Sequence, residues 1–139
     1  MPITHVIDRF RQRMWTRADG VVTLADIMAH LDAEARDRGL DLPELIDARD
    51  ASTNLTPHDV RLLVHRVRDM VRAQPFGPTA VVTTDDVAFG MARMFSILIE
   101  PTRVVFEVFR DVARADAWLA QASGPLNGTS PLRPDPPKE

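Results

Sequence analysis

Apolar residues recur at helical spacing in four segments of the chain, and these segments carry the signals that start or end helices. Thr23, with Asp26 three residues later, forms a variant of a capping box, and Gly39 is expected to end that helix in a left-handed conformation. Thr56 and Pro57 open the second helix as its cap and its first residue. The apolar faces of these two helices are Leu24, Ile27, Met28, Leu31 and Ala35, and Val60, Leu63, Val64, Val67 and Val71.

The other two helical patterns lie in the second half of the chain. Asp85 and Asp86 favour a helix N-terminus because their charges complement the helix dipole. The last helix is expected from about Val112 to Ala122. The apolar stripes of these helices are Val87, Met91, Met94, Phe95 and Leu98, and Val112, Ala115, Trp118 and Leu119.

Short apolar or alternating runs, typical of strands, separate the helical segments. We expect strands at residues 5–8, 12–18, 79–83 and 103–109, and a short buried strand at Leu45-Ile46. Asp19-Gly20 is expected to form a turn. Two strands come first, and helix and strand then alternate with short connections. This order predicts an α/β fold with a largely parallel sheet covered by helices.

The chain of 139 residues has the length of one ordinary domain, and its last segment differs in composition. Residues 123–139 hold five of the 11 prolines, and Leu126 and Leu132 are their only large apolar residues. Such a segment cannot bury enough apolar surface to offset the entropy lost on ordering. We therefore expect a single domain over residues 1–122 and a flexible, Pro-rich tail over 123–139.

Composition and charge exclude several classes of protein. The absence of cysteine rules out a disulfide scaffold, a Cys-ligated metal and a thiol nucleophile. The net charge of −3 argues against a nucleic-acid partner. Arg11, Arg13 and Arg17 with Trp15 could contact nucleic acid, but they would equally protect an edge strand, and we favour the edge.

Two further patterns bear on where the protein works. The N-terminus has no basic region followed by an apolar core, so we see no secretory signal. The apolar stretches are far shorter than the ~20 residues of a membrane helix. We expect a cytoplasmic protein without a membrane span.

The polar candidates for a ligand site follow from the position of the predicted strands. Ligands of open α/β sheets bind beyond the carboxyl ends of the strands, which here selects a loop over residues 47–56 and another over 83–86 that runs into 89–93. Their candidate ligand-facing residues are Asp47, Arg49, Thr83, Thr84 and Arg93. Backbone N–H groups at the two helix starts could hold a phosphate or carboxylate. The structural alternative is that Thr56 and Asp85 only cap helices, and that the two arginines only pair with nearby aspartates.

No catalytic or metal motif is present. The sequence has no HExxH, GxSxG, P-loop or GxGxxG pattern, and we expect no catalytic residue, metal or cofactor. His30 and His65 are expected on solvated helix faces, and Gly90 is better explained by helix packing than by a phosphate cradle. Met91, Met94 and Phe95 could form an apolar groove, although a place in the core explains them more simply.

Several short sequences together resemble the SpoIIAA-like (STAS/Sec14-type) family over roughly Thr4 to Gln121. They are Leu45-Ile46-Asp47-Ala48-Arg49-Asp50, Ala80-Val81-Val82, Phe89-Gly90-Met91-Ala92-Arg93-Met94-Phe95, Val108-Phe109-Arg110-Asp111 and Ala117-Trp118-Leu119. The resemblance implies a mixed, mainly parallel five-stranded sheet packed by about four helices, usually without enzymatic activity. It also implies either anti-anti-sigma-like protein regulation or the binding of an apolar or nucleotide ligand.

STAS regulators place a phosphorylated serine beside an aspartate, at the start of the helix that follows the third strand. Ser52, Thr53 and Thr56 occupy the comparable region of this chain. The Asp-Ser-Ser-Gly-Leu-Gly type of sequence is replaced here by Asp50-Ala51-Ser52-Thr53-Asn54, which lacks glycine. The resemblance therefore names these three hydroxyls as candidates for phosphorylation or for a partner-binding loop.

Three functional hypotheses follow. The first is a non-enzymatic regulatory domain that docks a protein partner over Ser52–Asp59 and the second helix. The second is a Sec14-like carrier that binds a small apolar or lipid ligand in a cleft beside Met91, Met94 and Phe95. The third and weakest is an enzyme, which would need Asp47, Arg49, Thr83 and Arg93 around one dry pocket. A homodimer is compatible with all three.

Overall fold

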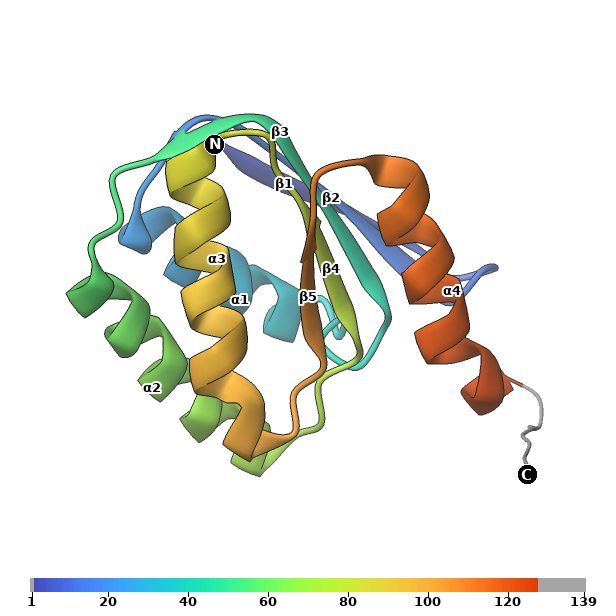
Figure 1. Ribbon diagram of the computed structural model, residues 1–139. Helices are drawn as coiled ribbons and strands as arrows, with labels where there is room; N and C mark the ends of the chain where they lie inside the picture. The colour runs from blue at the N-terminus through green and yellow to red at the C-terminus, as the bar shows by residue number, and fades with distance from the viewer. Residues whose placement is uncertain (1, 128–139) are drawn as a thin grey trace.

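A five-stranded sheet forms the centre of the computed structural model, which describes residues 2–127 (Figure 1). The strands are β1 (Ile3–Asp8), β2 (Arg13–Val22), β3 (Glu44–Thr53), β4 (Thr79–Val82) and β5 (Phe106–Phe109). Their order in the sheet is their order in the chain. β1 pairs with β2 antiparallel, and every later pair is parallel. The predicted mixed, mainly parallel sheet is confirmed.

Helices cover the sheet on both faces. α1 (Leu24–Arg36), α2 (Pro57–Ala73) and α3 (Asp86–Ile99) lie on one face, and α4 (Val112–Asn127) lies on the other (Figure 1). Each of the first three helices connects two neighbouring parallel strands, and each new strand is added at the same edge. Because such crossovers are right-handed, all three helices fall on one face. A short 3₁₀ turn, Glu100–Thr102, joins α3 to β5.

Two apolar layers separate the helices from the sheet. The larger lies beneath α1, α2 and α3, and its buried members are Leu31, Leu40, Val60, Leu63, Val64, Val67, Phe95 and Ile99. The smaller lies beneath α4 and consists of Leu45, Ala80, Val82, Ala115 and Leu119. Strand alternation explains the division, since neighbouring residues of one strand point to opposite faces.

The predicted helix starts are confirmed in detail. Thr23 with Asp26, and Thr56 with Asp59, form reciprocal capping boxes in which each side chain bonds the other residue's backbone N–H. The Asp85 carboxylate accepts a hydrogen bond from the N–H of Ala88 at the start of α3. Each such cap stabilises its helix by about 1 kcal/mol.

The predicted end of α1 is wrong in one respect. Arg38, not Gly39, takes the left-handed conformation, with φ of 62°. Gly39 is needed for a different reason, because a Cβ there would lie 3.0 Å from the sulfur of Met14. The absence of a side chain at Gly39 thus lets the chain pass close to Met14 near the start of β2.

β1 and β4 differ from the sequence prediction by one or two residues, and the other three strands differ by more. Asp19 and Gly20 belong to β2, since a bulge after Arg17 and the positive φ of Gly20, 71°, let the strand continue. β3 is ten residues long, so the predicted loop after Asp47 begins only after Thr53. β5 starts at Phe106, because the chain before it turns through Arg103 at φ 68°.

β2 is an interior strand, so its arginines do not protect an edge as predicted. β1 occupies that edge. Arg13 pairs with Asp116 of α4 and stacks over Trp15 at 4.5 Å, while Arg17 lies 2.8 Å from Asp50. α4 lies mainly over β3, β4 and β5, which leaves Trp15 and its cross-strand neighbour Val6 exposed.

The C-terminal segment is described only in part. α4 continues to Asn127, and the remainder of the predicted tail, residues 128–139, lies outside the described residues. Across residues 2–127, no helix combines the length and the apolar character that crossing a bilayer requires.

Two glycines offer a matched test of the packing. A Cβ on Gly77 would lie 2.5 Å from the carbonyl oxygen of Leu42, whereas a Cβ on Gly90 would meet nothing within 4 Å. The latter finding overturns the expectation that close helix packing explains Gly90. We expect Gly77→Ala to lower the free energy of unfolding by about 2–3 kcal/mol through backbone overlap. Gly90→Ala should raise it by about 1 kcal/mol, since alanine is the better helix former.

Urea titrations of the two variants and the parent measure both changes. A neutral Gly77→Ala would contradict the close approach of the segment before β4 to the Asp41-Leu42 turn.

Candidate functional site

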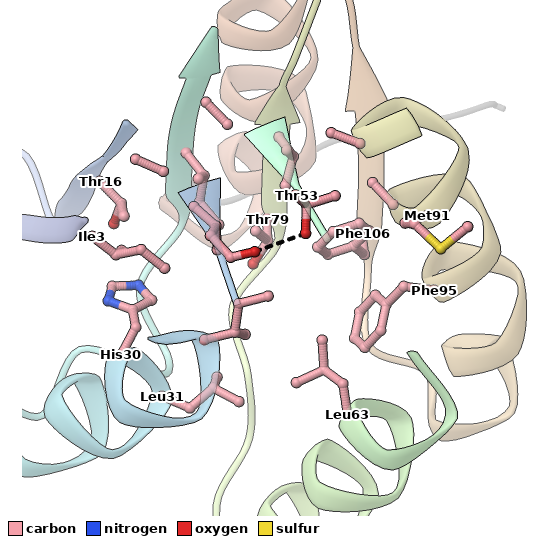
Figure 2. A pocket seen from close by; sticks show the side chains of 18 of the residues that line it. Ile3, Thr16, His30, Leu31, Thr53, Leu63, Thr79, Met91, Phe95 and Phe106 are labelled. Carbon is pink, nitrogen blue, oxygen red and sulfur yellow. Dashed lines mark hydrogen bonds between the residues drawn. The ribbon is translucent and has the colours of Figure 1, made fainter. Parts of the chain in front are cut away.

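A cavity of about 210 Å³ lies between the sheet and the three helices α1, α2 and α3. Its walls are mainly aliphatic and aromatic side chains, among them Ile3, Leu31, Leu63, Phe95 and Phe106 (Figure 2). Small residues on the sheet and on α3 leave the space open, namely Ala18, Ala48, Ala51, Ala88 and Ala92. The cavity is thus an apolar chamber enclosed mainly by one helical layer and the sheet.

Two of the three residues predicted for an apolar groove line this chamber. Met91 and Phe95 project from α3 toward it (Figure 2). Met94 packs against the same apolar layer but is not among the lining residues. The groove predicted beside α3 is therefore an internal cavity at that position.

The three hydroxyls predicted as a partner loop lie at and beyond the carboxyl end of β3, and two of them serve the fold. Thr53 donates a hydrogen bond to the carbonyl oxygen of Val22 at 2.8 Å and accepts one from the N–H of Leu55. Thr56 caps α2. Ser52 is exposed, and it lies at the rim of the cavity.

One wall of the cavity carries a buried polar cluster. His30 and Glu34 lie one turn apart on α1, and Glu44 is the first residue of β3. Nε2 of His30 is 3.1 Å from Oε2 of both glutamates, and the hydroxyl of Thr16 donates to Oε2 of Glu44 at 2.5 Å. Within the described residues, His30, Glu34 and Glu44 are the only ionisable side chains that line the cavity.

Burial and mutual charge shift all three ionisation equilibria. Burial disfavours the imidazolium, but hydrogen bonding and the negative charges of Glu34 and Glu44 outweigh it and raise the pKa of His30 to about 10. Burial and repulsion by Glu44 raise the pKa of Glu34 to about 8. Burial also opposes ionisation of Glu44, yet hydrogen bonds from His30, Glu34 and Thr16 and the charge of His30 prevail and lower its pKa. Near neutral pH, with no metal bound, the cluster thus pairs the imidazolium of His30 with the carboxylate of Glu44, and Glu34 beside them is protonated.

Sequence reasoning missed this cluster and placed His30 on a solvated face. Only 8% of His30 is exposed, and Glu34 is more deeply buried still. One available signal was the spacing of four between His30 and Glu34, which puts both on one helix face beside Leu31. Another was the position of Glu44, two residues before Ile46 and hence on the same face of the strand.

Three of the predicted ligand-facing residues, Asp47, Arg49 and Thr84, form a separate polar group along β3 and just beyond β4. Arg49 binds Asp47 through two side-chain bonds of 2.9 Å, which help to hold the pKa of Asp47 below its usual range. The hydroxyl of Thr84 donates to the carbonyl oxygen of Arg49 at 3.3 Å. Arg110, which sequence reasoning did not single out, reaches the carbonyl oxygen of Thr84 and the carboxylate of Asp86.

Thr83 and Arg93 do not complete that group. Thr83 is buried, and its hydroxyl has no hydrogen-bond partner among the described residues. Arg93 is exposed on α3 and makes no described ion pair. None of Asp47, Arg49, Thr83 and Arg93 lines the cavity, so the arrangement that the enzyme hypothesis required is not formed.

Comparison with known proteins identifies the fold. No protein-family model matches the chain, and no curated protein matches it. The structure is similar to the crystal structure of an uncharacterized protein of the DUF3478 family from Shewanella loihica PV-4, which has a SpoIIAA-like fold. The TM-score is 0.54 at 20% sequence identity, and the match covers 84% of this chain and 93% of that one. The protein therefore has a SpoIIAA-like α/β fold, as the sequence resemblance implied.

The buried cluster makes stability depend on pH in a defined direction. Because the pKa of Glu34 rises from 4.5 to about 8 on folding, the folded chain holds an extra proton between these values. The same holds for His30 between 6.5 and about 10. Both contributions are complete at low pH and are lost as pH rises. For chelator-treated protein we expect the free energy of unfolding to fall by roughly 1 kcal/mol per pH unit between about pH 5 and 6, where Glu34 is the main contributor.

Urea titrations across that range measure the slope. Glu34→Gln should remove it, while Glu100→Gln, which changes an exposed glutamate, should leave it intact. Equal slopes in the parent and in Glu34→Gln would show that Glu34 does not hold the proton.

Proposed function

We propose that the protein is a non-enzymatic binding domain that holds a small apolar molecule between its sheet and the three helices α1, α2 and α3. The observation that carries this proposal is the cavity itself, because globular interiors are normally packed to the density of organic crystals. A void of about 210 Å³ costs stability unless something compensates for it. A bound apolar molecule supplies that compensation by restoring the missing contacts.

The volume restricts the class of ligand. An engineered apolar cavity of about 150 Å³ binds benzene, so this chamber fits a molecule of roughly eight to ten non-hydrogen atoms. A substituted single ring or a short branched chain matches that size. A phospholipid of the kind a Sec14-type carrier would hold needs a much larger opening. Of the apolar or lipid ligands that the carrier hypothesis allows, the proposal therefore keeps only small apolar molecules.

The lining also indicates where a ligand enters and how it lies. Ser52 is exposed, and Leu55, Ala88 and Met91 are half-buried, which favours a mouth between the end of β3 and the start of α3. His30 and Thr16 lie across the chamber from Met91 and Phe95 (Figure 2). A ligand with one polar atom is expected to direct that atom toward His30, and its apolar part toward α3.

A substitution that fills the cavity tests the proposal. Ala92 lines the chamber from α3, and leucine is a good helix former, so Ala92→Leu should occupy the space without unfolding the chain. Across the described residues, Met91 is the only methionine among those that line the cavity. With ¹³C-methyl-labelled methionine, indole should therefore shift the NMR signal of Met91 in the parent and leave that of Met70 in place. The Ala92→Leu variant should lose the shift.

Ala117→Leu is the matched control, since Ala117 is exposed on α4, on the opposite face of the sheet. It should bind indole as the parent does. Native mass spectrometry of protein purified gently from its own host would then identify a co-purifying molecule. An unmoved Met91 signal with indole and with a panel of similar ring compounds, together with a bare mass, would refute the binding role.

A second candidate function rests on Ser52. It is the one hydroxyl of the predicted loop that is exposed and has no described hydrogen bond, as a kinase substrate requires. In this role the protein is a STAS-type regulator that docks a partner over Ser52–Asp59 and α2, and phosphorylation adds charge beside the acidic Asp50. Because Ser52 also lies at the cavity rim, one residue would connect partner binding to ligand entry.

Peptide mass spectrometry of protein from its host tests this role. A phosphate on Ser52, absent from a Ser52→Ala variant, would support it. Thr53 and Thr56 are expected to carry none, because both hydroxyls are engaged in the fold. Unmodified Ser52 under every growth condition tried would count against regulation by this route.

A further inference from the structure

Three ligand atoms of types that bind metals converge at one wall of the cavity. They are contributed by His30, Glu34 and Glu44, and they all lie within 4.8 Å of one another. One imidazole nitrogen and two carboxylate oxygens form a donor set suited to divalent first-row transition metals. All three residues are buried, so the cluster differs from the solvated carboxylate groups that are common on protein surfaces.

The spacing matches a coordination shell. Ligand atoms about 2.0–2.1 Å from a zinc ion at near-tetrahedral angles are roughly 3.3 Å apart. Nε2 of His30 lies 3.1 Å from the nearest oxygen of each glutamate. The hydroxyl of Thr16 holds the Glu44 carboxylate from behind, the kind of support that orients metal ligands.

An unsatisfied atom is the independent sign that something is missing. Oε2 of Glu34 is buried and is assigned no hydrogen bond, although it lies 3.1 Å from Nε2 of His30. Nε2 of His30 has one N–H to offer and lies 3.1 Å from one oxygen of each glutamate, so it cannot fully satisfy both. Without a metal, Glu34 therefore has to hold a proton, whereas a cation placed between the three residues would bind oxygens of both carboxylates directly.

Charge balance favours a divalent ion. A neutral imidazole and two carboxylates carry a charge of minus two, which one divalent cation cancels inside an otherwise apolar chamber. The chamber also supplies a path, because all three residues line the cavity that opens beside Ser52. An ion bound there would have protein ligands on one side and at least one coordination position facing the cavity.

We propose that His30, Glu34 and Glu44 bind one divalent transition-metal ion, with zinc as the best match, at the wall of the cavity. The site is built from α1 and β3, and its open position faces the chamber. It does not depend on the apolar ligand, because its three ligands all come from the chain. If both are bound, a polar atom of the ligand would meet the ion.

The test uses the full chain without an affinity tag, stripped with a chelator and then freed of it. We expect zinc to bind with one ion per chain in equilibrium dialysis, with the metal counted by mass spectrometry. Cobalt(II), used as a probe, should give the visible absorption bands of a four- or five-coordinate ion. Glu34→Gln keeps the shape of the side chain but weakens the ligand, and should reduce zinc affinity by at least about 100-fold.

Two controls keep the result interpretable. His65→Ala removes an exposed histidine from α2 and should bind zinc as the parent does. Thermal unfolding of metal-free Glu34→Gln should show an intact fold, and added zinc should raise the midpoint of the parent but not of this variant. The proposal is overturned if the parent takes up no zinc at micromolar concentrations, if Glu34→Gln binds as tightly as the parent, or if His65→Ala abolishes binding.

Discussion

The buried carboxylate of Glu44, the first residue of the central strand β3, determines which side chains must surround it in the interior. β3 pairs with β2 and β4, and its first residue, Glu44, is buried beneath α1 beside His30. Burying a carboxylate without partners is costly. Thr16 on β2 and His30 on α1 therefore have to face it, which ties the first helix to two strands at once. The docking of α1 depends on this polar contact together with the apolar packing of Leu31.

The two faces of the sheet are packed differently. Under α4, Leu45 and Leu119 fit closely against small neighbours such as Ala80 and Ala115. Under the other three helices, alanines on the sheet face large residues such as Phe95 across open space. Alanine is thus part of a packed layer on one face of the sheet and lines an open chamber on the other.

The helices were predictable from sequence because their signals are local. The capping boxes at Thr23 and Thr56 and the apolar stripe before Val67 need only neighbouring residues to be recognised. β3 was underestimated because its second half, from Asp47 to Asp50, is polar, and only pairing with β2 makes it a strand. A cleft beside Met91 and Phe95 was predicted, but the extent of the cavity and the His30 cluster were missed for a related reason. Each needs residues from distant segments, and periodicity within one segment cannot show what a facing segment supplies.

The chamber beneath α3 has a mechanical consequence. Unfolding a protein that contains an internal void reduces the volume of the system, because water fills space that was empty, by an amount of roughly 20–100 mL/mol in ordinary domains. Hydrostatic pressure therefore acts on this fold at the chamber, and the three-helix layer should yield before the close-packed layer under α4. Anything that fills the chamber also removes compressible space. Occupancy of the chamber would then lower the compressibility of the molecule, even where its shape stays the same.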